Sequence, residues 1–352
     1  MRAARFYGGK DIRVEEVPTP LPSHGEVLVR VKAAGICGSD LHGYRDPNLV
    51  WPGQKRPYLS GHELAGEVAA LGPGVEGLTV GQLVAVEPRH LAGCGHCRWC
   101  RRGDYQVCPE LGRRGGERLQ STGFAEYSLE DAGKCYPLSD TVKMEHAAIL
   151  DVYAVAVHAL HRVPLDPMDT VAVIGAGAIG LTTAQVAKAA GARRVIVIDT
   201  LDAQLAVARC TGCDETINAT KQDPVEVVRE LTGGEGAEVV FETVGGKAPT
   251  FGQALQMVAR GGQVGIIGTL IGAQNLDPSL CQRKEANIHW VYSYGLWNGV
   301  PEFQIALDLM ARGRVRPAPL ITHRFPLERI ADGFAAANDK AESGAVKVVV
   351  VP

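Results

Sequence analysis

The pattern of hydrophobic and polar positions divides the chain into two regions. Up to about residue 150, short runs of alternating, β-branched character are separated by Gly, Pro and Ser. Clear examples of such runs are Val27 to Val31, Gly66 to Ala70 and Leu83 to Val86. Runs of this kind are typical of strands, so residues 1–153 are predicted to form an irregular, β-rich domain.

From about residue 152 onward, fully apolar segments alternate with helical ones. Strands are predicted at Val171 to Ile174, Val195 to Ile198, Glu238 to Phe241 and Gln263 to Ile267, and helices at Ile179 to Ala190, Leu201 to Thr211 and Thr250 to Val258. Apolar strands that alternate with helices indicate a parallel sheet covered on both faces. Residues 154–294 are therefore predicted to form a doubly wound α/β domain of the Rossmann type.

The last segment, residues 295–352, contains a predicted helix at Phe303 to Arg312 and a predicted strand at Ala345 to Val351. We expect this segment to return to the first domain. A chain of 352 residues, of which 46% are hydrophobic and 21% charged, has the composition of a folded protein with two domains.

Composition also makes two partners unlikely candidates for this chain. The formal net charge is -3 and no long run of Lys and Arg occurs, so nucleic acid is not an expected partner. No stretch approaches the roughly 18 to 20 apolar residues of a membrane span, and the first residues lack the apolar core of a signal peptide. We expect no membrane association and a cytoplasmic location.

A glycine-rich turn follows the first apolar strand of the second region. Gly175, Gly177 and Gly180 form G-x-G-x-x-G at the start of a helix. The first glycine permits a tight turn, the second lets the backbone approach a pyrophosphate, and the third lets the helix pack closely. Asp199 ends the next strand, near the spacing of about 20 residues expected for a carboxylate that binds the ribose hydroxyls. Because Asp199 would repel a 2′-phosphate and no cation follows it directly, NAD is predicted over NADP.

Four cysteines crowd into one short lobe at about residues 90–112, at Cys94, Cys97, Cys100 and Cys108. Four thiolates can complete a closed tetrahedral shell around zinc, which predicts a structural zinc site. An iron–sulfur cluster is the less favoured alternative, because the spacing differs from the common ferredoxin patterns. Four unliganded thiols are less favoured still, since charged residues surround them. His96 lies in the same lobe, and we expect it to be a bystander.

Two further motifs precede this lobe, GICGSDLH (Gly35 to His42) and GHELAGEV (Gly61 to Val68). With the four-cysteine lobe and the nucleotide fingerprint, their order makes the whole chain resemble the zinc-containing medium-chain dehydrogenases of the alcohol dehydrogenase superfamily. The segments KAAGICGSDLHGY, GHELAGEVAALGPGVEGLTVGQLV and ITHRFPLERIADGF are most similar to the branch of sorbitol, 2,3-butanediol and threonine dehydrogenases. The resemblance implies a GroES-like catalytic domain and a Rossmann domain.

The resemblance also implies a catalytic site. Cys37 and His62 would bind a second, catalytic zinc, with Glu63 beside them as a ligand that can come and go. Ser39 would hydrogen-bond the substrate hydroxyl, and His42 would continue a proton relay toward solvent. Zinc lowers the pKa of an alcohol and the relay removes its proton, after which hydride passes to the nicotinamide.

One segment departs from the commonest pattern of this branch. Many members have Glu-Pro-Leu where this chain has Asp151, Val152 and Tyr153. The shorter carboxylate of Asp151 can reach zinc directly or through water, and in the second case Glu63 is the direct ligand. Both alternatives stay open from the sequence.

The remaining cofactor contacts are also implied by the resemblance. Ile179 is expected at the phosphate turn. The residues expected along the nicotinamide half are Val244, Ile267, Gly268, Thr269, Val291 and Tyr292.

The function predicted from these features is a zinc-dependent, NAD-linked oxidoreductase that interconverts a secondary alcohol and a ketone. Its small-molecule substrate would be a polyol, a vicinal diol or a cyclitol. Oxidation of an amino alcohol, as in L-threonine 3-dehydrogenase, is the alternative within the family. A catalytically silent NAD-binding sensor is the alternative outside enzymes, and the presence of Cys37, His62 and Ser39 disfavours it. Relatives are commonly dimers or tetramers, so we expect a homodimer or homotetramer, with residues 288–291 as a candidate edge strand.

Overall fold

The computed structural model describes residues 1–49, 55–111 and 121–352. Contacts within the chain separate it into two compact units. The first unit comprises residues 1–151, 298–312 and 321–352, and the second comprises residues 152–297 and 313–320. The C-terminal part of the chain therefore contributes to both units.

The first unit is built on a mixed β-sheet with the strand order β16-β17-β3-β4-β5-β7, in which β6 also pairs with β3. A separate hairpin is formed by β1 and β2. The strands of this unit are β1 (Arg2–Gly8), β2 (Asp11–Glu16), β3 (Glu26–Gly35), β4 (Glu63–Leu71), β5 (Leu83–Val86), β6 (Tyr127–Asp131), β7 (Cys135–Pro137), β15 (Val300–Pro301), β16 (Ile321–Pro326) and β17 (Lys347–Val351). The predicted β-rich region is confirmed. Strands β3 and β4 are longer than predicted because they pair with each other from Val27 and Leu71 to Gly35 and Glu63.

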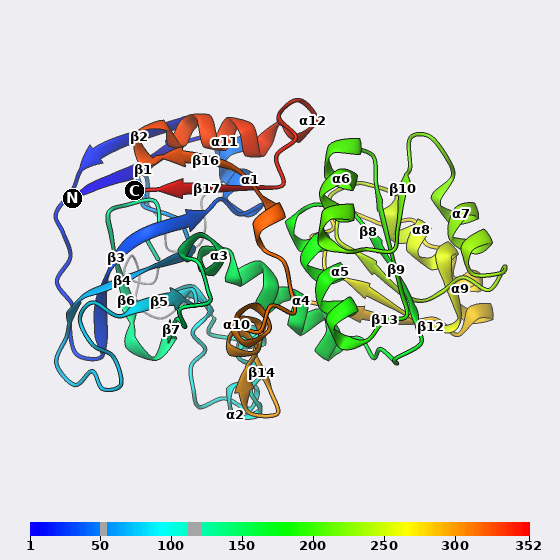
Figure 1. Ribbon diagram of the computed structural model, residues 1–352, viewed down its shortest axis with the longest axis horizontal. Helices are drawn as coiled ribbons and strands as arrows, with labels where there is room; N and C mark the ends of the chain where they lie inside the picture. The colour runs from blue at the N-terminus through cyan, green and yellow to red at the C-terminus, as the bar shows by residue number, and fades with distance from the viewer. Residues whose placement is uncertain (50–54, 112–120) are drawn as a thin grey trace. The chain divides into compact units, whose positions relative to one another are not determined.

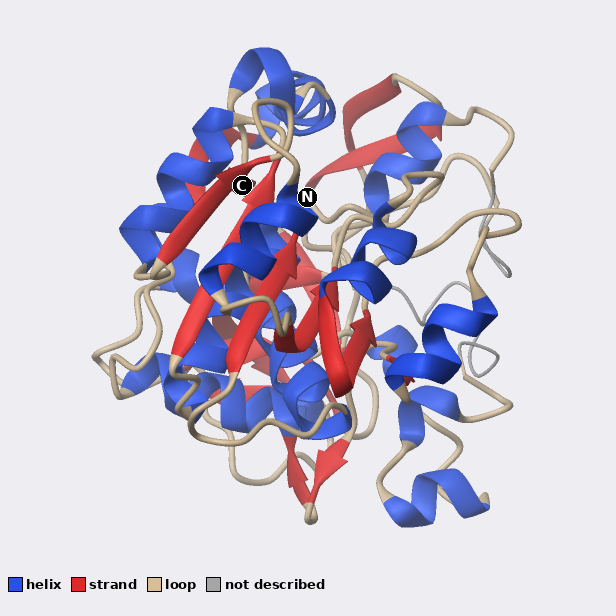
Figure 2. Ribbon diagram, turned by 90° about the vertical axis from the view of Figure 1, so that its right-hand side faces the viewer, coloured by secondary structure: helices blue, strands red, loops and turns tan. Residues whose placement is uncertain are grey.

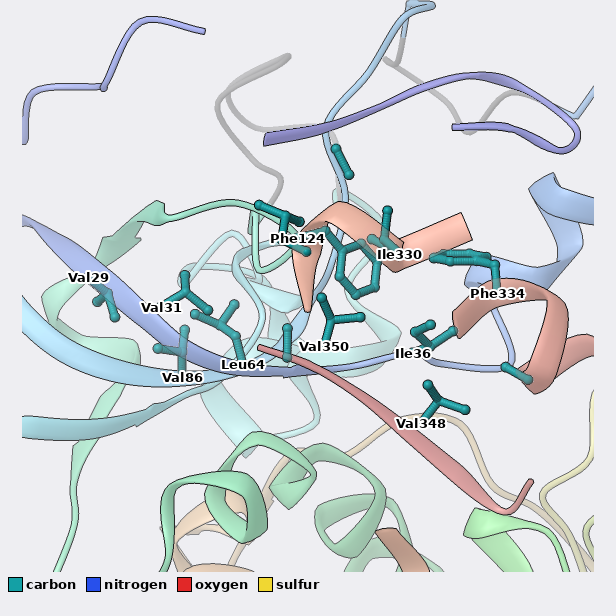
Figure 3. Close-up of a cluster of buried hydrophobic side chains, with 14 of the residues drawn as sticks. Val29, Val31, Ile36, Leu64, Val86, Phe124, Ile330, Phe334, Val348 and Val350 are labelled. Atoms are coloured by element: carbon teal, nitrogen blue, oxygen red, sulfur yellow. The ribbon is translucent and has the colours of Figure 1, made fainter. Parts of the chain in front are cut away.

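Apolar side chains on one face of this sheet form the core of the first unit (Figure 3). Val31 of β3, Leu64 of β4 and Val350 of β17 pack with Phe124 and with Phe334 of helix α11 (Ile330–Asn338). Phe124 and Phe334 are almost fully buried. Burial of one such side chain contributes about 1.5–3 kcal/mol, so this core holds the three strands in register.

Strand register brings the ends of three strands together. Gly35 at the end of β3 lies opposite Glu63 at the start of β4 and opposite Val349 of β17. Glu63 and Lys347, which are far apart in the sequence, therefore become neighbours across β3. The other helices of this unit are α1 (Asp40–Arg45), α2 (Arg98–Arg102), α3 (Met144–Ala148), α10 (Glu302–Ala311) and α12 (Lys340–Ser343).

The second unit contains a six-stranded parallel sheet in the order β10-β9-β8-β11-β12-β13. This is the strand order of a dinucleotide-binding Rossmann fold, as predicted. Its strands are β8 (Thr170–Ile174), β9 (Arg194–Asp199), β10 (Glu215–Asn218), β11 (Ala237–Glu242), β12 (Val258–Ile266) and β13 (Asn287–Trp290), with the short β14 (Leu296–Trp297) after them. Figure 2 shows these strands between helices on both faces.

The helices of the second unit are α4 (Leu150–Arg162), α5 (Ala178–Ala190), α6 (Asp202–Thr211), α7 (Pro224–Leu231), α8 (Thr250–Met257) and α9 (Pro278–Lys284). Helices α5 and α6 cover one face of the sheet, and α7, α8 and α9 cover the other (Figure 1). The predicted helix that was to end at Val258 stops at Met257, because Val258 is buried and already pairs with Ala237 of β11. Within the described ranges, no helix is both long and apolar enough to cross a membrane.

Candidate functional site

The four cysteines of the lobe converge on one point. Their sulfur atoms all lie within 4.8 Å of one another, with 3.9 Å between Cys94 and Cys100 and 3.9 Å between Cys97 and Cys108. None of the four forms a disulfide. Four sulfurs about 2.3 Å from a tetrahedral zinc ion lie about 3.8 Å apart, so these separations fit zinc. A shell of four thiolates leaves no position for a substrate.

Backbone amides donate hydrogen bonds to the sulfur atoms of two of these cysteines. The amide of Cys97 donates to the sulfur of Cys94 at 3.3 Å, and the amide of Cys100 donates to the sulfur of Cys97 at 3.4 Å. The second bond is the main reason why the pKa of Cys97 falls to about 7. The described part of the lobe, which ends at residue 111, therefore contains the complete predicted ligand set, while residue 112 lies outside the described residues.

A buried carboxylate that the sequence reasoning missed attaches the lobe to the sheet. Glu87 directly follows β5 and is fully buried. It accepts hydrogen bonds from the hydroxyls of Tyr105 and Tyr136, both at 2.7 Å, and also pairs with Lys134. Because Tyr105 lies between two of the zinc ligands in sequence, Glu87 fixes the lobe against β7. A lone Glu at the end of an apolar strand was the available signal.

A second group of metal-ligating side chains forms where β3 ends and β4 begins. One ligand atom each from Cys37, His62 and Glu63 lies within 4.8 Å of the others. Glu63 is fully buried, and its Oε1 accepts a 2.5 Å hydrogen bond from Lys347 Nζ. Its Oε2 is buried and has no hydrogen-bond partner among the described residues. A buried oxygen of this kind calls for a cation or a donor, and zinc fits this donor set of sulfur, nitrogen and oxygen.

Asp40, which was not predicted, lies beside Cys37 and His62 of this group. Its Oδ2 accepts the amide of Cys37 at 2.9 Å, and its Oδ1 accepts the hydroxyl of Ser60 at 3.1 Å. Oδ1 also lies 3.9 Å from Nδ1 of His62. Burial raises the pKa of Asp40. A carboxylate near the far side of a metal-ligating histidine orients its ring, and its position three residues after Cys37 was the available signal.

The expected relay residues lie on helix α1. Ser39 is the N-cap of this helix, and its hydroxyl makes no capping hydrogen bond within the described part of the chain. His42 follows one turn later and is partly exposed. This placement leaves the Ser39 hydroxyl available to a ligand and gives His42 access to water.

Asp151 lies close to this cluster but outside the three-residue group. It is buried in the first turn of α4. Although burial acts against both shifts, the charge of Cys37 raises the pKa of His62 and the charge of Glu63 raises the pKa of Lys347, and Asp151 adds a smaller effect to each. Of the two carboxylates that the sequence left open, Glu63 belongs to the converging group and Asp151 does not. Tyr153 is fully buried, and its hydroxyl lies 3.4 Å from the side-chain oxygen of Gln185 in the Rossmann unit.

The glycine turn has the geometry expected of a pyrophosphate-binding loop. Gly175 has a φ of 105°, and a Cβ there would lie 2.6 Å from Oγ1 of Thr243. A Cβ on Gly180 would lie 1.8 Å from the carbonyl oxygen of Gly175, so the helix can pack this closely only with glycine. Gly177 caps the N-terminus of α5, and Ile179 lies in its first turn.

The carboxylate of Asp199 is held beside this turn by backbone amides. Its Oδ2 accepts the amide of Ala176 at 2.6 Å. Its Oδ1 accepts the amides of Thr200 at 2.7 Å and Leu201 at 2.9 Å. The side chain is therefore fixed at the end of β9, next to the expected pyrophosphate position.

The residues expected at the nicotinamide half lie at the carboxyl ends of β11, β12 and β13. They are Val244, Ile267, Gly268, Thr269, Val291 and Tyr292. Val244 exposes 50% of its surface and Tyr292 exposes 61%, whereas Val291 is buried. The loops after β11 and β12 bond to each other, since the amide of Gly246 donates to the carbonyl of Thr269 at 2.8 Å. Ligands of such sheets bind at this edge.

These features define a class. A β-rich unit that carries a closed four-thiol site and an open cluster of Cys, His and Glu, joined to a Rossmann unit, is the architecture of a zinc-dependent dehydrogenase. Comparison with known families agrees. Residues 23–140 match the alcohol dehydrogenase GroES-like domain, and residues 178–312 match the zinc-binding dehydrogenase family.

Individual relatives cover almost the whole chain. The chain is 33% identical to sorbitol dehydrogenase of Bacillus subtilis, over 100% of this chain and 97% of the relative. It is 35% identical to L-threonine 3-dehydrogenase of Pyrococcus horikoshii, over 92% of this chain and 90% of the relative. The crystal structure of 2R,3R-butanediol dehydrogenase from Bacillus subtilis superposes with a TM-score of 0.87 at 30% identity, covering 100% of this chain and 99% of that one.

The chain belongs to the zinc-containing medium-chain alcohol dehydrogenase family. It is a zinc-dependent dehydrogenase that acts on CH–OH groups with NAD(P) as the acceptor.

The four-thiol site generates a prediction about stability. Cys97→Ser should remove one zinc ion per chain and lower the free energy of unfolding by more than about 4 kcal/mol, because loss of a structural metal is among the most destabilising changes. Metal analysis and thermal melting measure the two effects. Cys135→Ser is the matched control, since Cys135 is a buried cysteine of the same unit outside the cluster. Retention of the full zinc content by Cys97→Ser would contradict the assignment.

Proposed function

We propose that this enzyme oxidises a secondary alcohol of a polyol, vicinal diol or cyclitol to a ketone and reduces NAD. The observation that carries the proposal is the open cluster of Cys37, His62 and Glu63, where a buried carboxylate oxygen has no partner among the described residues. Residues 1–153 and 295–352 are assigned to catalysis, and residues 154–294 to NAD binding.

In this proposal Cys37, His62 and Glu63 hold the catalytic zinc, and Asp151 acts as an outer carboxylate through water. When bound, zinc supplies Lewis acidity that lowers the pKa of the substrate hydroxyl. Ser39 accepts the proton of that hydroxyl and passes its own proton to His42, which faces water. Ser39 caps the start of α1 and His42 lies in its first turn, so the backbone places the two residues one turn apart.

The preference for NAD over NADP is assigned to Asp199. Three backbone amides hold its carboxylate at the end of β9, and the remaining lone pair of Oδ2 can accept a ribose hydroxyl. The next carboxylate, Asp202, is already paired with Lys221 at 2.7 Å. Lys221 compensates the charge of Asp202, but no cation pairs with Asp199 among the described residues. A 2′-phosphate would meet the fixed negative charge of Asp199.

Amino-alcohol oxidation is the second candidate, supported by 35% identity to an L-threonine 3-dehydrogenase. Threonine carries a secondary hydroxyl, so the same metal and relay residues would serve it. A silent NAD-binding sensor is disfavoured, because Cys37, His62 and Ser39 are all present and the metal-ligating atoms converge.

A test of substrate class uses a panel of sugar alcohols, vicinal diols, cyclitols and L-threonine with the zinc-loaded enzyme and NAD. We expect the highest kcat/KM on a member of the first three groups, measured as formation of NADH. A kcat/KM for threonine above all of these would establish the amino-alcohol alternative. No turnover by fully metallated enzyme on any member would favour the sensor.

Ser39→Ala and His42→Ala are the matched variants for this panel. Ser39→Ala should lower kcat on the best substrate by about 10² to 10⁴, because a lost proton-transfer group costs this much, while the zinc content stays unchanged. His42→Ala should cost less, since water can replace a distal relay member. Nearly full activity of Ser39→Ala would exclude the proposed relay.

Cofactor choice is tested by Asp199→Asn. The variant keeps one oxygen for the amides of Thr200 and Leu201, gives up the acceptor of the Ala176 amide, and loses the charge that repels a 2′-phosphate. We expect the ratio of kcat/KM for NAD to that for NADP to fall by about tenfold or more, which corresponds to about 1.4 kcal/mol. Wild-type enzyme that uses NADP as well as NAD would show that Asp199 does not set the preference.

We also propose that the chain is a homodimer or homotetramer through the edge of the Rossmann sheet. Strand β13 is the last strand of that sheet, and Trp290 at its end is 62% exposed. An edge strand presents unpaired backbone groups, and with an exposed aromatic side chain beside them it favours pairing with a second copy. Light scattering should give a dimer or tetramer for the wild type and a smaller species for Trp290→Lys; a monomeric wild type would refute this interface.

A further inference from the structure

One buried ion pair lies beside the open metal cluster. The side chains of Lys347 and Glu63 are 3% and 0% exposed, and Lys347 Nζ donates to Glu63 Oε1 at 2.5 Å. Lysine is almost never buried without a partner, and here it begins a strand whose other residues are all valine. The strand that carries Lys347 therefore keeps its charge buried next to Glu63.

The sheet leaves space for this pair at one glycine. A Cβ on Gly35 would lie 2.2 Å from Glu63 Oε2 and 3.1 Å from Lys347 Cε. Gly35 lies on β3, between β4 and β17, which carry the two charged residues. The missing side chain is what lets the carboxylate and the ammonium meet across the middle strand.

The two carboxylate oxygens of Glu63 have different surroundings. Oε1 is bound by Lys347, whereas Oε2 has no partner among the described residues, and one oxygen of this carboxylate lies within 4.8 Å of the ligand atoms of Cys37 and His62.

We propose that Lys347 is a positioning residue that restrains Glu63 by one oxygen, so that this carboxylate binds the catalytic metal only weakly and yields its position to the substrate oxygen. The inference rests on the proposed metal site of Cys37, His62 and Glu63. Strand β17, which carries Lys347, would thereby affect how easily Glu63 leaves the metal.

The physical reason is competition between two cations for one carboxylate. An ion pair buried in the interior is stable only while both charges are present, and removal of one partner leaves an uncompensated charge. Without the Lys347 charge, the metal becomes the main compensation for Glu63. The carboxylate should then bind the metal persistently, and the repulsion between the ammonium and the metal disappears.

The decisive variant is Lys347→Met, which removes the charge and keeps a long apolar side chain. Mild chelation removes the catalytic zinc, and cobalt(II) replaces it as a visible probe. We expect an altered cobalt absorption spectrum, a release of cobalt to chelator that is slower by about 10- to 100-fold, and a lower kcat. Tighter metal with slower turnover separates positioning from simple damage, which would weaken both.

Lys347→Arg is the matched control, because it preserves the charge and should restore the wild-type spectrum and release rate. If Lys347→Met does not fold, Lys347→Gln decides the question, since it keeps a hydrogen-bond donor without the charge and should shift both readouts in the same direction. A spectrum and release rate equal to wild type in the neutral variants would overturn the role of Lys347. Equal cobalt uptake by wild type and Cys37→Ser would overturn the metal site as well.

Discussion

The catalytic unit depends on the need to compensate one buried carboxylate. Glu63 is fully buried, and the strand order β17-β3-β4 supplies its partner from the far end of the chain. A slip of one residue in β17 would turn Lys347 to the other face of the sheet and leave Glu63 uncompensated. The core around Val31 and Val350 that fixes this register therefore also fixes the electrostatics of the metal cluster.

Local patterns in the sequence predicted the elements that bury apolar runs. Strand β5 was predicted with the same bounds, and β8, β9 and β11 differ from prediction by one residue at each end or fewer. The sequence reasoning missed β10, because ETIN holds a single apolar residue, and it missed α7, although Val225 and Val228 of PVEVVREL lie one helical turn apart and are buried. Pairing with β9 in the sheet makes a strand of the first segment.

For the site too, sequence patterns predicted only those residues that lie close together along the chain. Cysteine spacing alone predicted the four-thiol cluster, because all its ligands are local in sequence. The resemblance to a family supplied Cys37, His62 and Glu63, which the spacing could not connect. Lys347 escaped both approaches, since its partner lies on another strand and only the register of the sheet joins them. Non-local charge pairs are the part of a site that a single sequence conveys least.

The two metal sites differ most in their net charge. Four thiolates around a divalent zinc ion give a net negative shell, which backbone amides of the lobe offset and which has no use for another anion. At the proposed catalytic site, one thiolate and one carboxylate would neutralise the same ion, Lys347 would add a positive charge, and Asp40 and Asp151 lie nearby as further carboxylates. This shell would carry less negative charge than four thiolates, so it would better accommodate the negative charge that develops on a substrate oxygen as its proton leaves. In the proposed enzyme, the same metal would therefore stabilise the fold in one place and favour deprotonation in the other, and the charges of the ligands and of the surrounding side chains would decide which.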